Sequence, residues 1–265
     1  MILTNELVFV HLPKTGGTFV RHILTKLDEA RIKGTWLSYL PPKIRKRVSR
    51  DFIDYDIWGQ PHRCCRQIPP SHRLKPILAT LRNPYDRYVS AYEFGCWRIN
   101  ASLYTHRHEV KKIHPHFPDL TFTEFVHDLT QIVTPIRVST TLGREMEIPF
   151  GWQTWQFVNF FFKEPTQVLP KLSPSYAHSK AYLADMYPIH FIRTHHLNQE
   201  LYDFLIGLGY HPQNIDFILT TPKILPRGRR RNPDQNWKKY YTPELKRYVR
   251  KKEDFIFTIF PEFDV

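Results

Sequence analysis

The sequence has little of what marks a secreted, membrane-spanning or fibrous protein. It holds three cysteines in 265 residues, two of them adjacent at Cys64 and Cys65, too few for a disulfide framework; this indicates a reducing compartment. No apolar run approaches the roughly 18 residues of a membrane span, and the densest run, 157–162, contains Asn159. No basic stretch followed by a long apolar core begins the chain, so we expect no cleaved secretion signal. With 42% hydrophobic and 24% charged residues, the composition predicts a globular protein. Without a span or a signal, we expect it in the cytoplasm.

Acidic residues are scarce relative to basic ones. Lysine and arginine number 38 against 25 acidic residues, a net charge of +13, and twelve of these basic residues lie between positions 222 and 252. This excess favours a polyanionic partner: a nucleic acid, an anionic membrane surface, an acidic polysaccharide or a nucleotide with several phosphates. A solvated helix face explains the run 246–252 at least as well. Arg227–Arg231 lie among prolines and a glycine, and there we favour a ligand.

Short apolar runs alternate with helical patterns along the chain. Four runs predict strands: 7–10, 55–58, 76–81 and 189–192. This alternation is typical of α/β proteins, and we predict a three-layer sandwich with a central parallel sheet. We expect one domain spanning residues 1–265, in which residues 98–185 form a mostly helical insertion. A last helix is expected to begin at Pro243, with Thr242 as its N-cap.

The segment 13–18, Pro-Lys-Thr-Gly-Gly-Thr, joins the first predicted strand to a helix. Gly16 and Gly17 let the backbone approach an anion, and the helix N-terminus offers N–H groups and the positive end of its dipole. The other polar side chains of the segment add one mobile charge and two hydroxyls: Lys14, Thr15 and Thr18. We therefore interpret the segment as a phosphate-binding loop rather than an ordinary connection.

This loop differs from the ATP-binding P-loop. In that motif the lysine follows the last glycine, whereas Lys14 precedes Gly16, and the first glycine of the motif has no counterpart here. No predicted strand ends in an aspartate suited to hold Mg²⁺. A kinase-like phosphotransferase is therefore disfavoured, although it is the alternative enzyme class.

A second anion-binding motif follows the third predicted strand. Arg82 ends that strand, Pro84 sits at the first position of a helix, and Ser90 lies two turns into it. Arginine makes bidentate contacts with phosphates, and a serine hydroxyl can orient the same group. Arg82 and Ser90 are therefore candidates to bind one further phosphate.

The segments 13–18 and 82–90 together resemble the phosphosulfate loop and the 3′-phosphate motif of sulfotransferases. The resemblance is closest to the carbohydrate O-sulfotransferases of the heparan and chondroitin type and their bacterial relatives. It implies the P-loop-like sulfotransferase fold, 3′-phosphoadenosine 5′-phosphosulfate (PAPS) as donor and 3′-phosphoadenosine 5′-phosphate (PAP) as product, without a metal. It further implies a hydroxyl acceptor, expected to be a carbohydrate or glycolipid, and no nucleic-acid partner. Location at the periphery of a membrane, or in the Golgi lumen for a trimmed eukaryotic catalytic domain, is compatible with it.

The resemblance also implies roles for single residues. Lys14 would neutralise charge on the leaving phosphate, Thr15 to Thr18 would hold the 5′-phosphate, and Arg82 with Ser90 the 3′-phosphate. A late loop closes over the nucleotide in relatives, and three arginines fall where that loop is expected: Arg229, Arg230 and Arg231.

The acceptor's proton requires a base, for which histidine is suited near neutral pH. We favour His62, which follows a predicted strand end, over His11, which sits where the first strand meets the loop. Trp152 and Gln153 are candidates to line a sugar site.

Four histidines of the predicted insertion have spacings and polar surroundings that match no recognisable zinc site, so we expect a solvated or acceptor-facing loop there and no metal. They are His106, His108, His114 and His116. The non-enzymatic alternative for the whole chain is a polyanion-binding or nucleic-acid-binding module that acts through the basic segment 222–252.

Overall fold

The computed structural model describes residues 1–41, 44, 51–60, 62–99, 107–224 and 236–265. The chain forms two compact units. The first comprises Met1–Arg82 and Pro188–Arg231, and the second comprises Asn83–Tyr187 and Asn232–Val265. No helix among the described residues is both long and apolar enough to cross a bilayer.

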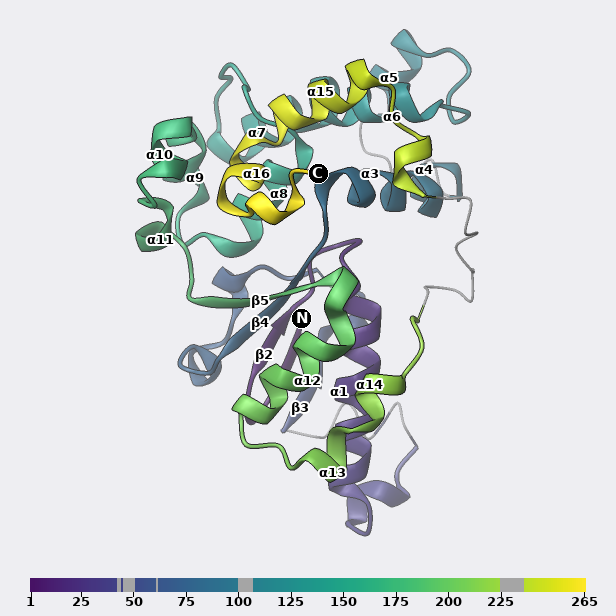
Figure 1. The fold of residues 1–265 in the computed structure, drawn as a ribbon, viewed down its shortest axis with the longest axis vertical. Helices are drawn as coiled ribbons and strands as arrows, with labels where there is room; N and C mark the ends of the chain where they lie inside the picture. Colours follow the sequence, from purple (N-terminus) through teal and green to yellow (C-terminus); the bar gives the residue numbers. More distant parts are fainter. Residues whose placement is uncertain (42–43, 45–50, 61, 100–106, 225–235) are drawn as a thin grey trace. The chain divides into compact units, whose positions relative to one another are not determined.

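A five-stranded sheet in the order β3-β1-β2-β4-β5 organises the first unit (Figure 1). Its strands are β1 (Ile2–Thr4), β2 (Val8–Val10), β3 (Phe52–Asp54), β4 (Ile77–Leu81) and β5 (Ile189–Arg193). The strands β2, β4 and β5 run parallel, with Phe9 opposite Leu78 and Ala79 opposite Phe191. The prediction of an α/β protein is confirmed, but the sheet is mixed because β1 pairs antiparallel with both β2 and β3.

The predicted strand at 55–58 is wrong. Residues Tyr55–Trp58 form a 3₁₀ turn, and the strand is the preceding segment, β3. The carboxylate of Asp54 accepts a hydrogen bond from the backbone N–H of Asp56 at 3.0 Å, which starts the turn. Gly59, with φ of +68°, ends it. The turn thus begins at the last residue of the strand, where the Asp54 side chain bonds to the backbone two residues on.

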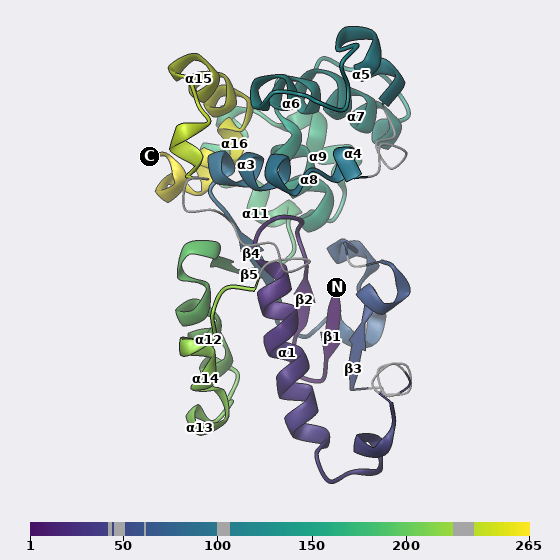
Figure 2. The same cartoon turned by 90° about the vertical axis from the view of Figure 1, so that its right-hand side faces the viewer.

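Helices cover one face of this sheet (Figures 1 and 2). They are α1 (Gly17–Ile32), α12 (Leu197–Gly207), α13 (Pro212–Ile215) and α14 (Phe217–Thr220). Phe9, Leu78 and Ile192 project from this face and form one buried core with residues of these helices, among them Phe19 and Leu201. The apolar residues of α1 and α12 therefore face the sheet.

The second unit is built almost entirely of helices. Its longer helices are α3 (Pro84–Phe94), α5 (Arg107–Ile113), α6 (Phe122–Asp128), α7 (Thr134–Leu142), α8 (Trp152–Phe161), α15 (Pro243–Lys252) and α16 (Asp254–Ile259). Short helices of four or five residues complete it: α4 (Cys96–Ile99), α9 (Pro165–Val168), α10 (Pro174–His178) and α11 (Tyr182–Asp185). Its core is aromatic: the ring of Phe157 lies 5.0 Å from that of Phe161 and 5.8 Å from that of Phe260.

The predicted helix starts of this unit are confirmed. Pro84 is the first residue of α3, and the Asn83 side chain accepts a hydrogen bond from the N–H of Tyr85. Pro243 begins α15, and the hydroxyl of Thr242 accepts from the N–H of Leu245. Both starts use a capping side chain followed by proline, which has no N–H to satisfy.

Candidate functional site

The loop between β2 and α1 lies at the carboxyl ends of the parallel strands, where open α/β sheets bind ligands. Lys14 and Gly16 have positive φ values of 68° and 97°. This conformation is strained for a lysine, and such strain persists only where the surroundings hold it. Gly16 is the N-cap of α1 and has no side chain with which to cap it, so the first turn of the helix presents its backbone to an anion.

Hydrogen bonds from two other strand ends hold this loop. The buried hydroxyl of Thr15 lies 2.7 Å from the carbonyl of Leu12 and 2.6 Å from the hydroxyl of Thr80 in β4. The hydroxyl of Thr194, just after β5, lies 2.7 Å from the carbonyl of Thr15 and 2.7 Å from that of Leu81. The hydroxyl of Thr15, expected to contact a phosphate, is therefore committed to the loop itself, which leaves its backbone for a ligand. Thr18 lies half-buried in the first turn of α1.

Gly16 and Gly17 each allow another part of the first unit to lie close to the backbone of the loop. A Cβ on Gly17 would lie 2.0 Å from Cδ2 of the His11 ring, so only glycine fits beneath that ring. A Cβ on Gly16 would meet Leu197 of α12 at 3.0 Å, in a backbone conformation that already disfavours side chains. The two glycines thus bring the start of α1 against His11 and α12.

The structure brings Arg82 to the same loop. The residue follows β4 directly, and its Nη1 lies 3.4 Å from the backbone carbonyl of Lys14. Because β2 and β4 are adjacent parallel strands, the two cationic residues stand at neighbouring strand ends. The guanidinium of Arg82 thus contacts the backbone of the glycine loop, and both residues belong to the first unit.

Both candidate bases also lie at this site. The rings of His11 and His62 have centroids 4.9 Å apart, and Nδ1 of His62 lies 3.1 Å from the carbonyl oxygen of His11. Burial lowers the pKa of His11 to about 3, and the positive charges of nearby groups, Lys14 among them, contribute to the decrease. His11 therefore stays neutral at physiological pH and is a weak base, whereas His62 is exposed.

The hydrogen bond to His11 selects one tautomer of His62. A carbonyl oxygen only accepts hydrogen bonds, so a neutral His62 that bonds to it carries its proton on Nδ1. The lone pair is then on Nε2, the nitrogen that can take a proton.

The other predicted site residues that the structure describes belong to the second unit. Ser90 is half-buried on α3, in the second unit. Trp152 and Gln153 begin α8 in the same unit. The Gln153 side chain is buried and donates from Nε2 to the carbonyl of Pro84 at 2.8 Å, which occupies the amide expected to contact a sugar. The predicted nucleotide-loop arginines, Arg229, Arg230 and Arg231, lie outside the described residues.

Two residues that shape this site, Thr80 and Thr194, were not predicted from the sequence. Each stands at or beside the carboxyl end of a predicted strand, and that position was the available signal. Their partners lie 65 and 179 residues away along the chain, so no local pattern could identify them.

Comparison with known proteins identifies the family of this chain. A model of the sulfotransferase family matches residues 2–201, a span that runs from β1 into α12 and includes the loop, Arg82 and both histidines. No curated protein gives a significant match. No solved structure does either. Since the family model covers most of the chain, the protein belongs to the sulfotransferase family, whose reaction is the transfer of a sulfuryl group.

Proposed function

We propose that this protein transfers a sulfuryl group from PAPS to an acceptor hydroxyl, with a carbohydrate as the favoured acceptor. The observation that carries the proposal is the convergence of Lys14 and Arg82 on one glycine loop, with Nη1 of Arg82 3.4 Å from the Lys14 carbonyl. Two cationic groups at adjacent strand ends suit a nucleotide that carries phosphates at two positions. The family match supports the reaction class.

The residues of the loop fit such a donor. The conformation of Gly16 and the contact of Gly17 with His11 leave no room for side chains, which is the condition for a phosphate to approach backbone N–H groups. When bound, the donor supplies an activated sulfuryl group and a phosphate as leaving group. We assign the 5′-phosphate to the backbone of Thr15 to Thr18 and the 3′-phosphate to Arg82.

The side chains around the loop perform the other tasks of an in-line transfer, which are to position the reactants and to stabilise charge. Lys14 holds a positive charge at the loop, where it neutralises charge that develops on a leaving phosphate. His62 takes the proton of the acceptor hydroxyl at Nε2. His11 orients His62 through its carbonyl and supports Gly17 through its ring, so we assign it a positioning role.

The favoured acceptor is a hydroxyl group of a carbohydrate or glycolipid. A carbohydrate or glycolipid is favoured by the resemblance of segments 13–18 and 82–90, and by the net charge of +13, which suits an anionic polysaccharide. Trp152, which begins α8 with a half-buried ring, is a candidate sugar contact. Gln153 is not included, because its side chain is buried and hydrogen-bonded.

Calorimetry with 3′,5′-ADP and with ADP tests the donor. We expect the doubly substituted nucleotide to bind at least tenfold more tightly, and Arg82→Ala to abolish this preference. Arg247→Ala, at a largely exposed side chain, is the matched control and keeps it. Equal binding of the two nucleotides, or Mg²⁺-dependent ATP turnover, contradicts the proposal.

A second variant tests the base. His62→Ala is expected to keep the affinity for 3′,5′-ADP and to lose at least a hundredfold in turnover with radiolabelled PAPS and a panel of acceptors. Turnover equal to that of the unmodified protein removes His62 from this role.

A further inference from the structure

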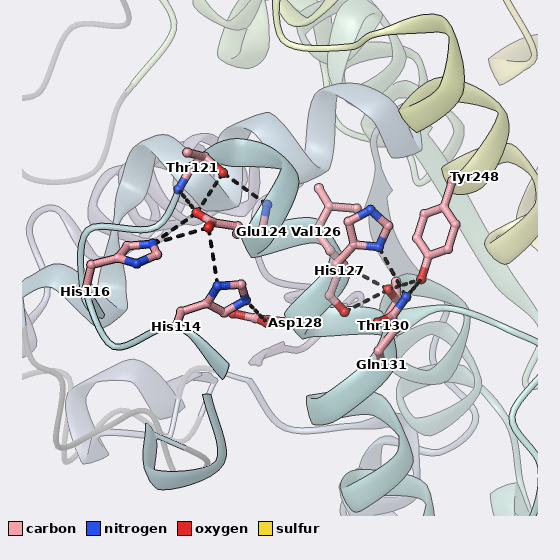
Figure 3. A network of polar contacts seen from close by, with 10 residues as sticks. All are labelled: His114, His116, Thr121, Glu124, Val126, His127, Asp128, Thr130, Gln131 and Tyr248. Carbon is pink, nitrogen blue, oxygen red and sulfur yellow. Dashed lines mark hydrogen bonds and ion pairs between the residues drawn. The ribbon is translucent and has the colours of Figure 1, made fainter. Parts of the chain in front are cut away.

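A cluster of imidazole and carboxylate groups in the second unit takes no part in the proposed transfer. His114 and His116 lie in the turn that follows α5, and Glu124 lies in the first turn of α6. One donor atom from each lies within 4.8 Å of the other two. Figure 3 shows both rings turned toward the Glu124 carboxylate.

The spacing of these atoms suits ligands around one metal ion, and Nε2 of His116 also lies 3.3 Å from Oε2 of Glu124, within hydrogen-bond distance. Nδ1 of His114 lies 3.3 Å from Oε1 of Glu124, and Nε2 of His116 lies 3.3 Å from the same oxygen. A tetrahedral zinc ion with bonds of about 2.0 Å separates its ligands by about 3.3 Å. Neutral imidazole and carboxylate are also ligands that Zn²⁺ accepts.

Asp128 and Thr121 form hydrogen bonds that orient two of the three proposed ligands. Nε2 of His114 lies 3.1 Å from Oδ1 of Asp128, so the ring can donate there while Nδ1 faces Glu124. Histidines that bind metals commonly donate their second N–H to a carboxylate in this way. The N–H and hydroxyl of Thr121 donate to Oε2 of Glu124 at 2.7 and 2.8 Å, which turns Oε1 toward the histidines.

The burial of the Asp128 carboxyl group is a second observation that points to a cation in this cluster. Its side chain is only 3% exposed, and Oδ2 has no hydrogen-bond partner among the residues that the structure describes. A buried carboxylate requires a compensating positive charge. A divalent cation bound to His114 would supply positive charge beside the Asp128 and Glu124 carboxyl groups.

We propose that His114 Nδ1, His116 Nε2 and Glu124 Oε1 bind one Zn²⁺ ion, with water at the fourth position. Asp128 orients His114 and does not touch the metal. The ion joins the turn after α5 to the first turn of α6. This site is distinct from the proposed donor site, and its role is to stabilise the second unit.

Zinc binding by the full chain, measured by calorimetry and by elemental analysis after equilibrium dialysis, tests the proposal. We expect one tight site per chain. His116→Ala is the first variant, because a side chain that is 49% exposed can be removed without unfolding the protein. Glu124→Gln is the second, because glutamine preserves the capping box with Thr121 while the anionic ligand is lost. Each is expected to weaken binding at least a hundredfold.

Two further variants separate this site from zinc bound by scattered surface histidines. Asp128→Asn should weaken binding by about 10 to 100-fold, as expected of a group that orients a ligand. His108→Ala, on α5 outside the cluster, should leave binding unchanged. Absence of a tight site, or equal loss in His108→Ala and His116→Ala, overturns the proposal. The four groups are then only an ion-pair cluster.

Discussion

At the scale of single residues, the contact between Gly17 and His11 makes the start of α1 intolerant of any side chain. We expect Gly17→Ala to lower the free energy of unfolding by about 1–3 kcal/mol, because the new methyl group overlaps the imidazole ring. The affinity for 3′,5′-ADP should fall as well, since the ring or the loop must move. Urea unfolding and calorimetry measure the two effects.

Another glycine provides the matched control. Gly207 is exposed at the end of α12 and has no positive φ, and a Cβ added there would have no described neighbour within 4 Å. Gly207→Ala should therefore be neutral or stabilise by up to about 1 kcal/mol. The double variant Gly17→Ala, His11→Ala should regain part of the lost stability. No recovery in that double variant would show that the ring is not the obstacle.

The lowered pKa of His11 predicts a pH dependence of stability. The folded pKa is about 3, whereas a histidine in the unfolded chain titrates near 6.5. Between these values the unfolded state binds a proton that the folded state does not, so stability is complete above about pH 6.5 and is lost as the pH falls toward 3. We expect this residue to contribute a loss on the order of 1–2 kcal/mol between pH 7 and pH 5. Urea unfolding of His11→Gln should show a smaller loss over that interval, and an unchanged slope contradicts the assignment.

At the scale of elements, α8 begins with a cap from a distant residue. Gly151, its N-cap, has no side chain, and the carboxylate of Glu253 takes this place. Oε1 of Glu253 accepts from the N–H of Gln153 at 3.0 Å and from the Tyr88 hydroxyl at 2.5 Å, and Oε2 accepts from the N–H and hydroxyl of Thr154. Burial raises the pKa of Glu253, and these hydrogen bonds oppose the rise. All four partners are donors, so the ionised form satisfies all of them.

Removing the charge of Glu253 should therefore destabilise the helical unit. In Glu253→Gln the amide NH₂ cannot accept, which leaves two buried donors without an acceptor at about 1–3 kcal/mol each. We expect a loss of about 2–4 kcal/mol in urea unfolding. Glu145→Gln, at an exposed position, is the control and should change stability by less than about 0.5 kcal/mol. Equal stability of the two variants would argue that Glu253 is protonated in the folded protein.

The histidine-rich stretch shows why a site formed by two separate elements is difficult to predict from the sequence. The four histidines as a set match no zinc spacing, and His106 lies outside the described residues. The ligand set found in the structure needs Glu124, which a sequence pattern explains fully as the third residue of a capping box. Only the fold of the turn shows that the same carboxylate also faces His114 and His116.

At the scale of the whole molecule, the proposed donor should stabilise the protein by linkage. A ligand at 100 times its dissociation constant adds about 2.7 kcal/mol when it binds only the folded state. We expect 3′,5′-ADP to raise the Tm, and ADP at the same concentration to raise it less. Arg82→Ala should lose the difference, whereas Arg247→Ala should keep it. Thermal scans that show equal shifts from both nucleotides contradict the proposed pairing of Lys14 with Arg82.

What the sequence determined by itself was the set of features made by neighbouring residues. The loop from Pro13 to Thr18, the helix starts at Pro84 and Pro243, and membership of the sulfotransferase family all follow from contiguous segments. In these the backbone and the side chain that shapes it are a few residues apart, so the pattern is readable. The α/β class likewise followed from the alternation of strands with helices along the chain.

Only the tertiary structure decided which distant residues form hydrogen bonds with these segments and which side chains are charged. The hydrogen bonds that Thr194 donates to Thr15 and that Gln153 donates to Glu253 join residues 179 and 100 positions apart. The low pKa of His11 likewise arises from burial, which is a property of the folded chain. The physical reason is the same in each case: the energy of a hydrogen bond or a buried charge depends on distance in space, and distance along the chain does not reveal it.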